Sequence, residues 1–368
     1  MKAVLDMTIV AHALGGVGRY TLGLARGLSR RAGELGLEVC FVDVPAARRG
    51  TLPPWPGALE LADPFYSRIR GLARASGMIG LERITRGSRI GRLADADLYH
   101  VSGVQPRYPR GRAAVLTFFD PSALEHPEWH TPDTVRYARA EADMARRGAA
   151  LLAISEWAAA RARAIFGPGS LIGVAGGAAD GIFSPGEPDP SVLGNLGLEP
   201  GGYLLHVGNY VPRKNIPLLL EARSLAACRG AGMPLVLAGA GGWREPDARA
   251  PGVLALRAVS DSTMLSLYRG ARALLLPSLY EGLGLPALEA MACGTGVVAS
   301  DATALPETLA GCGMLLPPGD AGAWADAIVA LEAGGLASEL ASRALGRPRQ
   351  TWDSVAERAC AFYLEAAR

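Results

Sequence analysis

Short, mainly apolar runs alternate along the chain with longer segments whose apolar residues recur at helical spacing. Each run has the length of a buried strand and stops at a polar residue, a glycine or a proline. The clearest runs are residues 39–44, 150–155, 203–208 and 273–277. The alternation predicts successive β-α-β units and therefore parallel sheets with a doubly wound α/β architecture.

The chain is long enough to contain two domains, because 368 residues exceed the size that one hydrophobic core usually serves. Residues 180–202 are rich in proline and glycine and lack periodicity, which is typical of a linker. We place an N-terminal domain at residues 1–185 and a second domain at residues 186–350. A final helical pattern follows at residues 351–368.

Composition narrows the class of protein. Hydrophobic residues make up 49% and charged residues 20% of the chain, which fits a globular protein and excludes a disordered one. The formal net charge of +2 is too small to favour nucleic acid as a partner. No apolar run reaches the ~18 residues of a membrane span and no signal peptide is evident, so we expect a cytoplasmic protein. Five scattered cysteines without paired spacing predict no zinc site.

One stretch is strongly basic. Residues 66–93 carry seven arginines against one glutamate, interleaved with apolar residues. Two interpretations remain open: contact with an anionic membrane surface or a pyrophosphate-linked acceptor, and an ordinary solvated helix face. The first interpretation would place the protein peripherally at the inner face of the membrane.

The strongest candidate site is a turn that follows a buried strand. Gly282 and Gly284 let the backbone approach a ligand, and Pro286 suits the start of a helix, whose free N–H groups attract anions. Glu281 in the turn and Glu289 in the helix can accept hydrogen bonds from vicinal hydroxyl groups. The stretch predicts a site for a phosphate and a polyol. The alternative is a solvated loop acid and a carboxylate that interacts with the helix dipole.

Two other turns offer groups to a phosphate. Gly15 and Gly16 open a helical segment, so backbone N–H groups can face an anion there, with Arg19 as a natural contact. Arg213 and Lys214 stand at another helix start, where a guanidinium fork and an ammonium suit a pyrophosphate leaving group. A flexible helix start and ordinary surface basic residues are the alternatives. The glycine spacing is not that of a dinucleotide-binding loop.

Two strands expected at residues 97–102 and 114–120 end in polar residues at the carboxyl edge of the first sheet, where α/β proteins bind ligands. They carry His100 and Asp120. His126 follows on a loop from which it can reach the same site, although a surface histidine is the alternative interpretation.

The string that contains Glu281 and Glu289 resembles the E-x-G-x-G-x-P-x-x-E-A-M-A-C-G-T signature of family 4 of the retaining nucleotide-sugar glycosyltransferases, known also as glycosyl transferases group 1. Residues 207–215 resemble the family's V-G-x-x-x-P-R-K-N turn. The resemblance implies the GT-B fold, two Rossmann-like doubly wound domains facing a central cleft. It also implies that residues 351–368 form a helix that crosses back to the first domain.

The resemblance assigns roles as well. Glu281 would contact the donor sugar and Glu289 the ribose, while Arg213 and Lys214 would meet the donor diphosphate in place of a metal ion. The implied donor-binding residues are Gly15, Gly16, Gly208, Gly282, Leu283, Gly284 and Glu289, and the implied acceptor or sugar pocket contains Arg19, His100, Phe119, Asp120 and His126. Phe119 departs from the family, which has a histidine there. An apolar ring at this place predicts a 6-deoxy or otherwise less polar donor sugar, unless His126 fills the position.

We therefore expect a retaining hexosyltransferase of polysaccharide biosynthesis that needs neither a metal ion nor a cofactor. It would move a sugar from a nucleoside-diphosphate sugar to a hydroxyl group of a glycan, lipid-linked or small-molecule acceptor. The alternative, which only Phe119 supports, is a nucleotide-sugar-binding regulatory subunit without turnover.

Overall fold

The computed structural model describes residues 1–7, 9–10, 15–43, 59–60, 96–102, 112–239, 250–257 and 259–368. The chain divides into two compact units. Unit 1 comprises Met1–Gly177 together with Trp352–Arg368, and unit 2 comprises Ala178–Thr351. The Arg-rich stretch at residues 66–93, for which two interpretations were open, lies outside the described residues.

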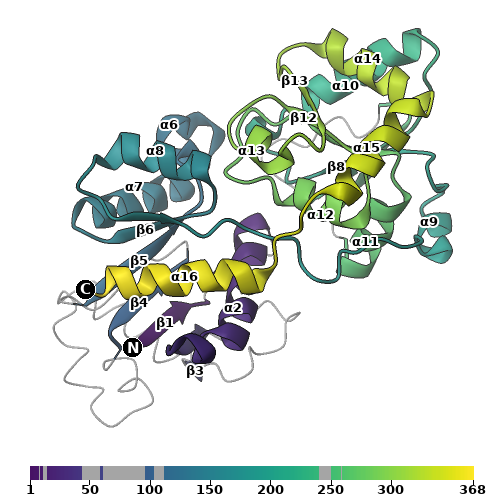
Figure 1. Cartoon of the computed structure of the whole chain (residues 1–368). Helices are drawn as coiled ribbons and strands as arrows, with labels where there is room; N and C mark the ends of the chain where they lie inside the picture. Colours follow the sequence, from purple (N-terminus) through teal and green to yellow (C-terminus); the bar gives the residue numbers. More distant parts are fainter. Residues whose placement is uncertain are drawn as a thin grey trace. The chain divides into compact units, whose positions relative to one another are not determined.

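Unit 1 is built on a parallel sheet with the strand order β3-β2-β1-β4-β5-β6-β7. Its strands are β1 (Lys2–Asp6), β2 (Glu38–Asp43), β3 (Leu59–Glu60), β4 (Leu98–Val101), β5 (Ala113–Phe118), β6 (Ala150–Ala153) and β7 (Ile172–Val174). Its helices include α2 (Gly16–Arg31), α6 (Ser122–Glu125), α7 (Pro132–Arg146), α8 (Glu156–Phe166) and α16 (Trp352–Ala366), with short 3-10 turns η1 (Gly33–Leu35) and η4 (Pro127–Trp129) (Figure 1).

Unit 2 repeats the architecture with the order β10-β9-β8-β11-β12-β13, again parallel. Its strands are β8 (Leu204–Val207), β9 (Leu235–Ala238), β10 (Val253–Leu256), β11 (Ala273–Leu276), β12 (Val297–Ser300) and β13 (Met314–Leu316). Its helices include α9 (Pro190–Asn195), α10 (Ile216–Cys228), α11 (Asp261–Gly270), α12 (Leu285–Cys293), α13 (Leu305–Leu309), α14 (Ala321–Glu332) and α15 (Gly335–Gly346), with η5 (Pro212–Lys214). In both sheets the strand order reverses beside the first strand, which confirms the doubly wound prediction.

The last helix of the chain is part of unit 1, where α16 packs along α2 (Figure 1). Two glycines of α2 make this approach possible. A Cβ atom on Gly23 would lie 2.0 Å from Cε2 of Trp352, and one on Gly27 would lie 2.1 Å from the Trp352 carbonyl oxygen. Arg30 also pairs with Asp353 at the solvent-exposed side of the contact. Residues separated by more than 300 positions thus form one helix pair.

The expectation that residues 180–202 form an irregular linker is wrong in part. They belong to unit 2, and helix α9 begins among them at Pro190, with Asp189 as its N-cap. Asp189 accepts a hydrogen bond from the Ser191 backbone N–H at 2.9 Å. Aspartate followed by proline is a turn signal as well as a helix start, and a helix of six residues is too short to show periodicity.

Candidate active site

The carboxyl edge of the second sheet gathers the motifs of the C-terminal half. The strand order reverses between β8 and β11, so the segments that follow these two strands lie side by side at that edge. One segment carries Arg213 and Lys214, and the other carries Glu281. They are joined by a backbone hydrogen bond of 2.8 Å, in which the Leu279 N–H donates to the Arg213 carbonyl. Topology therefore brings together two motifs that are far apart in sequence.

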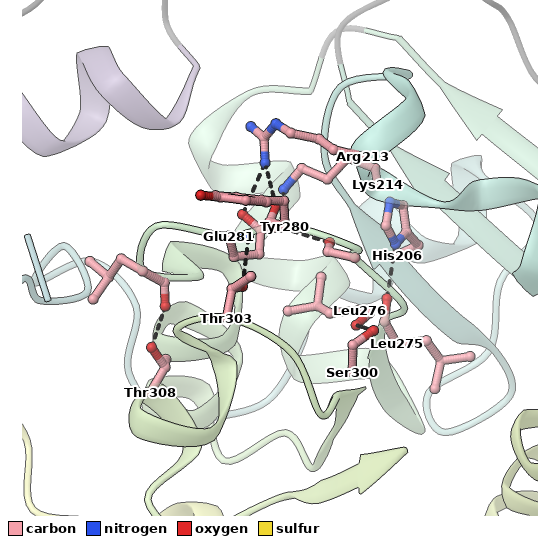
Figure 2. A network of polar contacts seen from close by, with 12 residues as sticks. His206, Arg213, Lys214, Leu275, Leu276, Tyr280, Glu281, Ser300, Thr303 and Thr308 are labelled. Carbon is pink, nitrogen blue, oxygen red and sulfur yellow. Dashed lines mark hydrogen bonds and ion pairs between the residues drawn. The ribbon is translucent and has the colours of Figure 1, made fainter. Parts of the chain in front are cut away.

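Glu281 is the centre of a buried cluster of charges (Figure 2). Lys214 Nζ donates to Glu281 Oε1 at 2.5 Å, and Arg213 donates to Oε2 at 3.2 Å. Ser278 Oγ donates to Oε1 at 2.7 Å. The same guanidinium nitrogen of Arg213 also donates to the Tyr280 carbonyl at 3.0 Å. Sequence analysis expected these three charged residues in one site, and the structure brings them into direct contact.

The cluster holds Glu281 in its ionised form. Burial would raise the pKa of this carboxyl group, but the charges of Lys214 and Arg213, together with the hydrogen bonds from Lys214 and Ser278, lower it to about 2. With one carboxylate against two cations, the three groups carry a net charge of +1 at neutral pH. The site is thus positive overall while the buried lysine is paired.

The loop before α10 is shaped to hold Lys214. A Cβ atom on Gly208 would lie 3.1 Å from Lys214 Cε, so a glycine leaves room for the lysine stem. Asn215 adopts a left-handed conformation with φ of 54°, and its amide donates to the Pro277 carbonyl at 3.2 Å and to the Pro318 carbonyl at 2.8 Å. These bonds fix the point where the chain leaves the cluster and enters the helix.

The turn from Glu281 to Gly284 is fixed by residues that sequence analysis did not single out. The Glu281 N–H donates to Thr303 Oγ1 at 2.9 Å, and Thr308 Oγ1 donates to the Leu283 carbonyl (Figure 2). Gly284 has φ of 83° and caps α12, and a Cβ atom there would lie 2.8 Å from Leu305 Cδ2. Glycine is therefore required at this position by backbone conformation and packing.

His206 lies in β8 beneath the cluster and was not expected from the sequence (Figure 2). Its Nδ1 donates to the Leu275 carbonyl at 2.9 Å, and its Nε2 has no hydrogen-bond partner among the described residues. Burial lowers the pKa of His206 to about 4, so the imidazole is neutral at pH 7. A neutral ring adds no further positive charge beside Lys214.

Glu289 belongs to a second set of contacts in the same unit. It lies in the second turn of α12, where it is buried, and its Oε2 accepts a hydrogen bond of 2.8 Å from the hydroxyl group of Tyr268 in α11. The sequence identified Glu289 but not its partner, because the two residues lie on successive helices that no local motif links.

In unit 1 the glycine-rich segment is already helical. The sequence placed Gly15 and Gly16 in a turn before the helix, whereas Gly15 is the N-cap of α2 and Gly16 is its first residue. The Arg19 N–H donates to the Gly15 carbonyl at 3.0 Å, as expected for the first helical turn. The start of a long helix is thus located at these glycines, with the Arg19 side chain partly buried beside it.

His100 is the next-to-last residue of β4, and its side chain is buried within unit 1. Its Nδ1 lies 2.5 Å from the hydroxyl oxygen of Tyr363 in α16, and its Nε2 lies 2.7 Å from Thr117 Oγ1. Burial lowers the pKa of His100 to about 3, so the ring is neutral. Both ring nitrogens thus have hydrogen-bond partners within the unit, one of them from α16, and a role of His100 toward a ligand stays a prediction.

The other residues of the expected sugar or acceptor pocket make local contacts. The ring of Phe119 packs edge to face against Tyr20, with centroids 5.4 Å apart. Asp120 Oδ1 accepts a hydrogen bond of 2.9 Å from the Ser122 N–H at the start of α6. His126 stacks on Trp129 at 3.9 Å. Their roles toward a ligand stay predictions.

Comparison with solved structures first defines the fold class of the protein. Sucrose-phosphate synthase from Thermosynechococcus elongatus superimposes with a TM-score of 0.70 and 18% identity over 99% of this chain and 98% of that chain. HepE from Anabaena, solved in complex with UDP-glucose, superimposes with a TM-score of 0.66 and 17% identity over 100% of both chains. Two doubly wound parallel sheets of this kind are the GT-B fold.

Sequence comparison then gives the family. The family model for glycosyl transferases group 1 matches residues 201–333, which include Arg213, Lys214, Glu281 and Glu289. O-antigen chain mannosyltransferase B of Escherichia coli is 32% identical over 340 residues, which is 87% of this chain and 87% of that protein. The chain belongs to the group 1 glycosyltransferase family.

Among the described residues, no three histidine, cysteine, aspartate or glutamate side chains are grouped in a way that would hold a metal ion. None of the described helices is both long enough and apolar enough to span a membrane.

Proposed function

We propose that the protein transfers a mannosyl residue from a nucleoside-diphosphate mannose to a hydroxyl group of a polysaccharide acceptor, with retention of configuration and without a metal ion. The relative from Escherichia coli is named as a mannosyltransferase of the O-antigen chain, and it is similar to this protein over most of both chains. This similarity supports mannose over the 6-deoxy sugar that Phe119 alone predicts. HepE, solved with UDP-glucose, supports a nucleotide-sugar donor.

The observation that carries the proposal is the Arg213–Lys214–Glu281 cluster at the point where the second sheet reverses its strand order. Two fixed cations next to a helix start would stabilise the negative charge that develops on a departing diphosphate. A divalent cation can stabilise the same negative charge on a diphosphate, and in this proposal the two side chains take its place. The diphosphate oxygens would displace Glu281 from the cations, and the freed carboxylate would accept hydrogen bonds from the sugar.

In the proposed reaction one bond to C1 of the sugar breaks and one new bond to C1 forms. The bond between C1 and the diphosphate oxygen breaks, and the acceptor oxygen bonds to C1 from the same face, so the configuration is retained. The acceptor's hydroxyl proton passes to the diphosphate oxygen that leaves. Arg213 and Lys214 act on the leaving group, and Glu281 orients the sugar whose ring gains positive charge in the transition state.

The remaining assignments follow the same division. Unit 2 would hold the donor, with Glu289 on the ribose, and unit 1 would hold the acceptor. A regulatory subunit that binds a nucleotide sugar without turning it over is the competing function. It would release no nucleotide from the donor.

The test combines binding with turnover. Thermal shifts are recorded with GDP-mannose, GDP-6-deoxymannose, UDP-glucose and ADP-glucose in a buffer that contains EDTA, since a ligand that binds the folded state raises its melting temperature. Nucleotide release is then measured with and without a mannose-terminated acceptor, and proton NMR gives the anomeric configuration of the product. An inverted product, or activity that EDTA abolishes, contradicts the proposal. Binding without any nucleotide release supports the regulatory subunit instead.

A further inference from the structure

Tyr268 lies against Glu289 in a fully enclosed position. The ring of Tyr268 is 0% exposed and Glu289 is 6% exposed, and the phenol donates to Glu289 Oε2 at 2.8 Å. A carboxyl group that is removed from water needs hydrogen-bond partners, because an unpaired buried polar group costs free energy. The tyrosine hydroxyl supplies such a partner.

The position of the phenol is itself fixed from two sides. The ring packs edge to face against Phe183, with centroids 5.4 Å apart. The backbone of Tyr268 is held by Thr295 Oγ1, which donates to the Tyr268 carbonyl at 2.6 Å from just beyond the end of α12. Two hydrogen bonds therefore hold Tyr268 of α11: its hydroxyl group bonds Glu289 in α12, and its carbonyl bonds Thr295 just beyond α12.

We infer that Tyr268 is a positioning residue that sets the orientation of the Glu289 carboxylate toward the ribose of the donor nucleotide. The inference rests on the proposed assignment of Glu289 to the ribose. With one carboxylate oxygen bound to a fixed phenol, the plane of the carboxylate is set before the nucleotide binds. Two neighbouring ribose hydroxyls require such a defined plane, because small errors in orientation weaken both hydrogen bonds together.

The experiment measures how well each variant distinguishes a ribose from a sugar without its hydroxyls. Affinities for GDP and UDP are compared with those for their 2′,3′-dideoxy forms by titration calorimetry. The variants are Tyr268→Phe, Glu289→Gln and the control Tyr203→Phe. Tyr203 is equally buried in the same unit, and its hydroxyl donates to the Leu267 carbonyl at 2.7 Å rather than to a site residue. The control therefore loses the same chemical group and a hydrogen bond of similar length.

We expect the native protein to prefer the ribose form of its nucleotide by about tenfold, as the loss of paired polar contacts allows. Tyr268→Phe and Glu289→Gln should both reduce this preference to about twofold or less, whereas Tyr203→Phe should leave it unchanged. In the double variant the effects of Tyr268→Phe and Glu289→Gln should not add, because they act on one contact.

Two results would overturn the inference alone. Tyr268→Phe could retain the native preference, or it could weaken the ribose and dideoxy forms equally, which is what a purely structural role predicts. In both cases Glu289→Gln still loses the preference. If Glu289→Gln keeps the preference, or the native protein shows none, the assignment of Glu289 to the ribose is wrong and the role of Tyr268 falls with it.

Discussion

Glu281→Gln isolates the charge at the centre of the site while nearly preserving its shape. The pKa of Glu281 falls from an ordinary 4.5 to about 2, so the surrounding groups favour the ionised form by about 3 kcal/mol. Removing one partner of a buried ion pair also leaves Lys214, whose side chain is 8% exposed, without its counter-charge. We expect the free energy of unfolding of unit 2 to fall by about 3 kcal/mol, which lowers its melting temperature by about 6–12 °C.

The effect should depend on pH in a defined direction. Because the folded protein lowers the pKa of Glu281, the stabilisation is fully present above about pH 4.5 and is lost as the pH falls toward 2. The melting temperatures of the native protein and of Glu281→Gln should therefore differ by a constant amount near neutrality and converge below pH 4.5. Calorimetric scans between pH 7 and pH 3.5 measure this difference.

Ligand binding should change in the opposite sense from stability. The substitution raises the net charge of the three groups from +1 to +2, because one negative charge is removed. A free nucleoside diphosphate no longer competes with Glu281 for the cations, so its affinity should rise by up to about tenfold at low ionic strength. The intact donor should not gain in the same way, because its sugar loses the carboxylate, and turnover should fall by roughly 10²-fold.

The control is Glu339→Gln, which breaks an exposed ion pair with Arg343 on α15. Exposed pairs of this kind contribute less than about 1 kcal/mol, so its melting temperature and nucleotide affinity should remain close to native. Unchanged melting of Glu281→Gln, or weaker binding of the free nucleoside diphosphate, would refute the electrostatic account of the cluster.

Three other changes test different parts of the structure. Lys214→Ala should lower turnover by roughly 10²-fold in steady-state kinetics, because it removes a positive charge that would stabilise the leaving diphosphate. Near-normal kinetics would contradict this. Phe119→His should shift the preference between GDP-mannose and GDP-6-deoxymannose by about tenfold toward mannose if residue 119 contacts the sugar, and an unmoved ratio in competition assays would exclude that contact. Gly23→Ala should lower the melting temperature of unit 1, because the new methyl group overlaps the Trp352 ring, whereas Gly33→Ala meets nothing within 4 Å and should not.

Local patterns were enough to predict the doubly wound architecture and to single out Arg213, Lys214 and Glu281. Each motif directly follows a strand, and parallel strands bring their carboxyl ends to one edge, so Lys214 and Glu281 could be expected together although 67 positions separate them. The supporting residues could not be predicted in this way. Tyr268 and Thr303 act across turns between elements, and their hydrogen bonds depend on helix packing that periodicity does not describe.

The contacts of His100 could not be predicted for a similar physical reason. Alternation along a strand indicates which residues share a face, but it does not say which helix covers that face. The helix that covers His100 is α16, and its Tyr363 lies 263 positions after His100 in the chain. A histidine with one hydrogen-bond partner so distant in sequence cannot be distinguished from a ligand contact by its local pattern.

The return of the chain to unit 1 also determines the order in which the protein can be completed. Unit 2 is continuous in sequence and is inserted between the two parts of unit 1. During synthesis, all of unit 2 is added to the chain before Trp352 and Tyr363, which pack on α2 and bond His100. At ordinary translation rates the 191 residues that follow Gly177 take on the order of ten seconds or more. Through that interval the surface of α2 that receives Trp352 lacks its partner from the C-terminal segment.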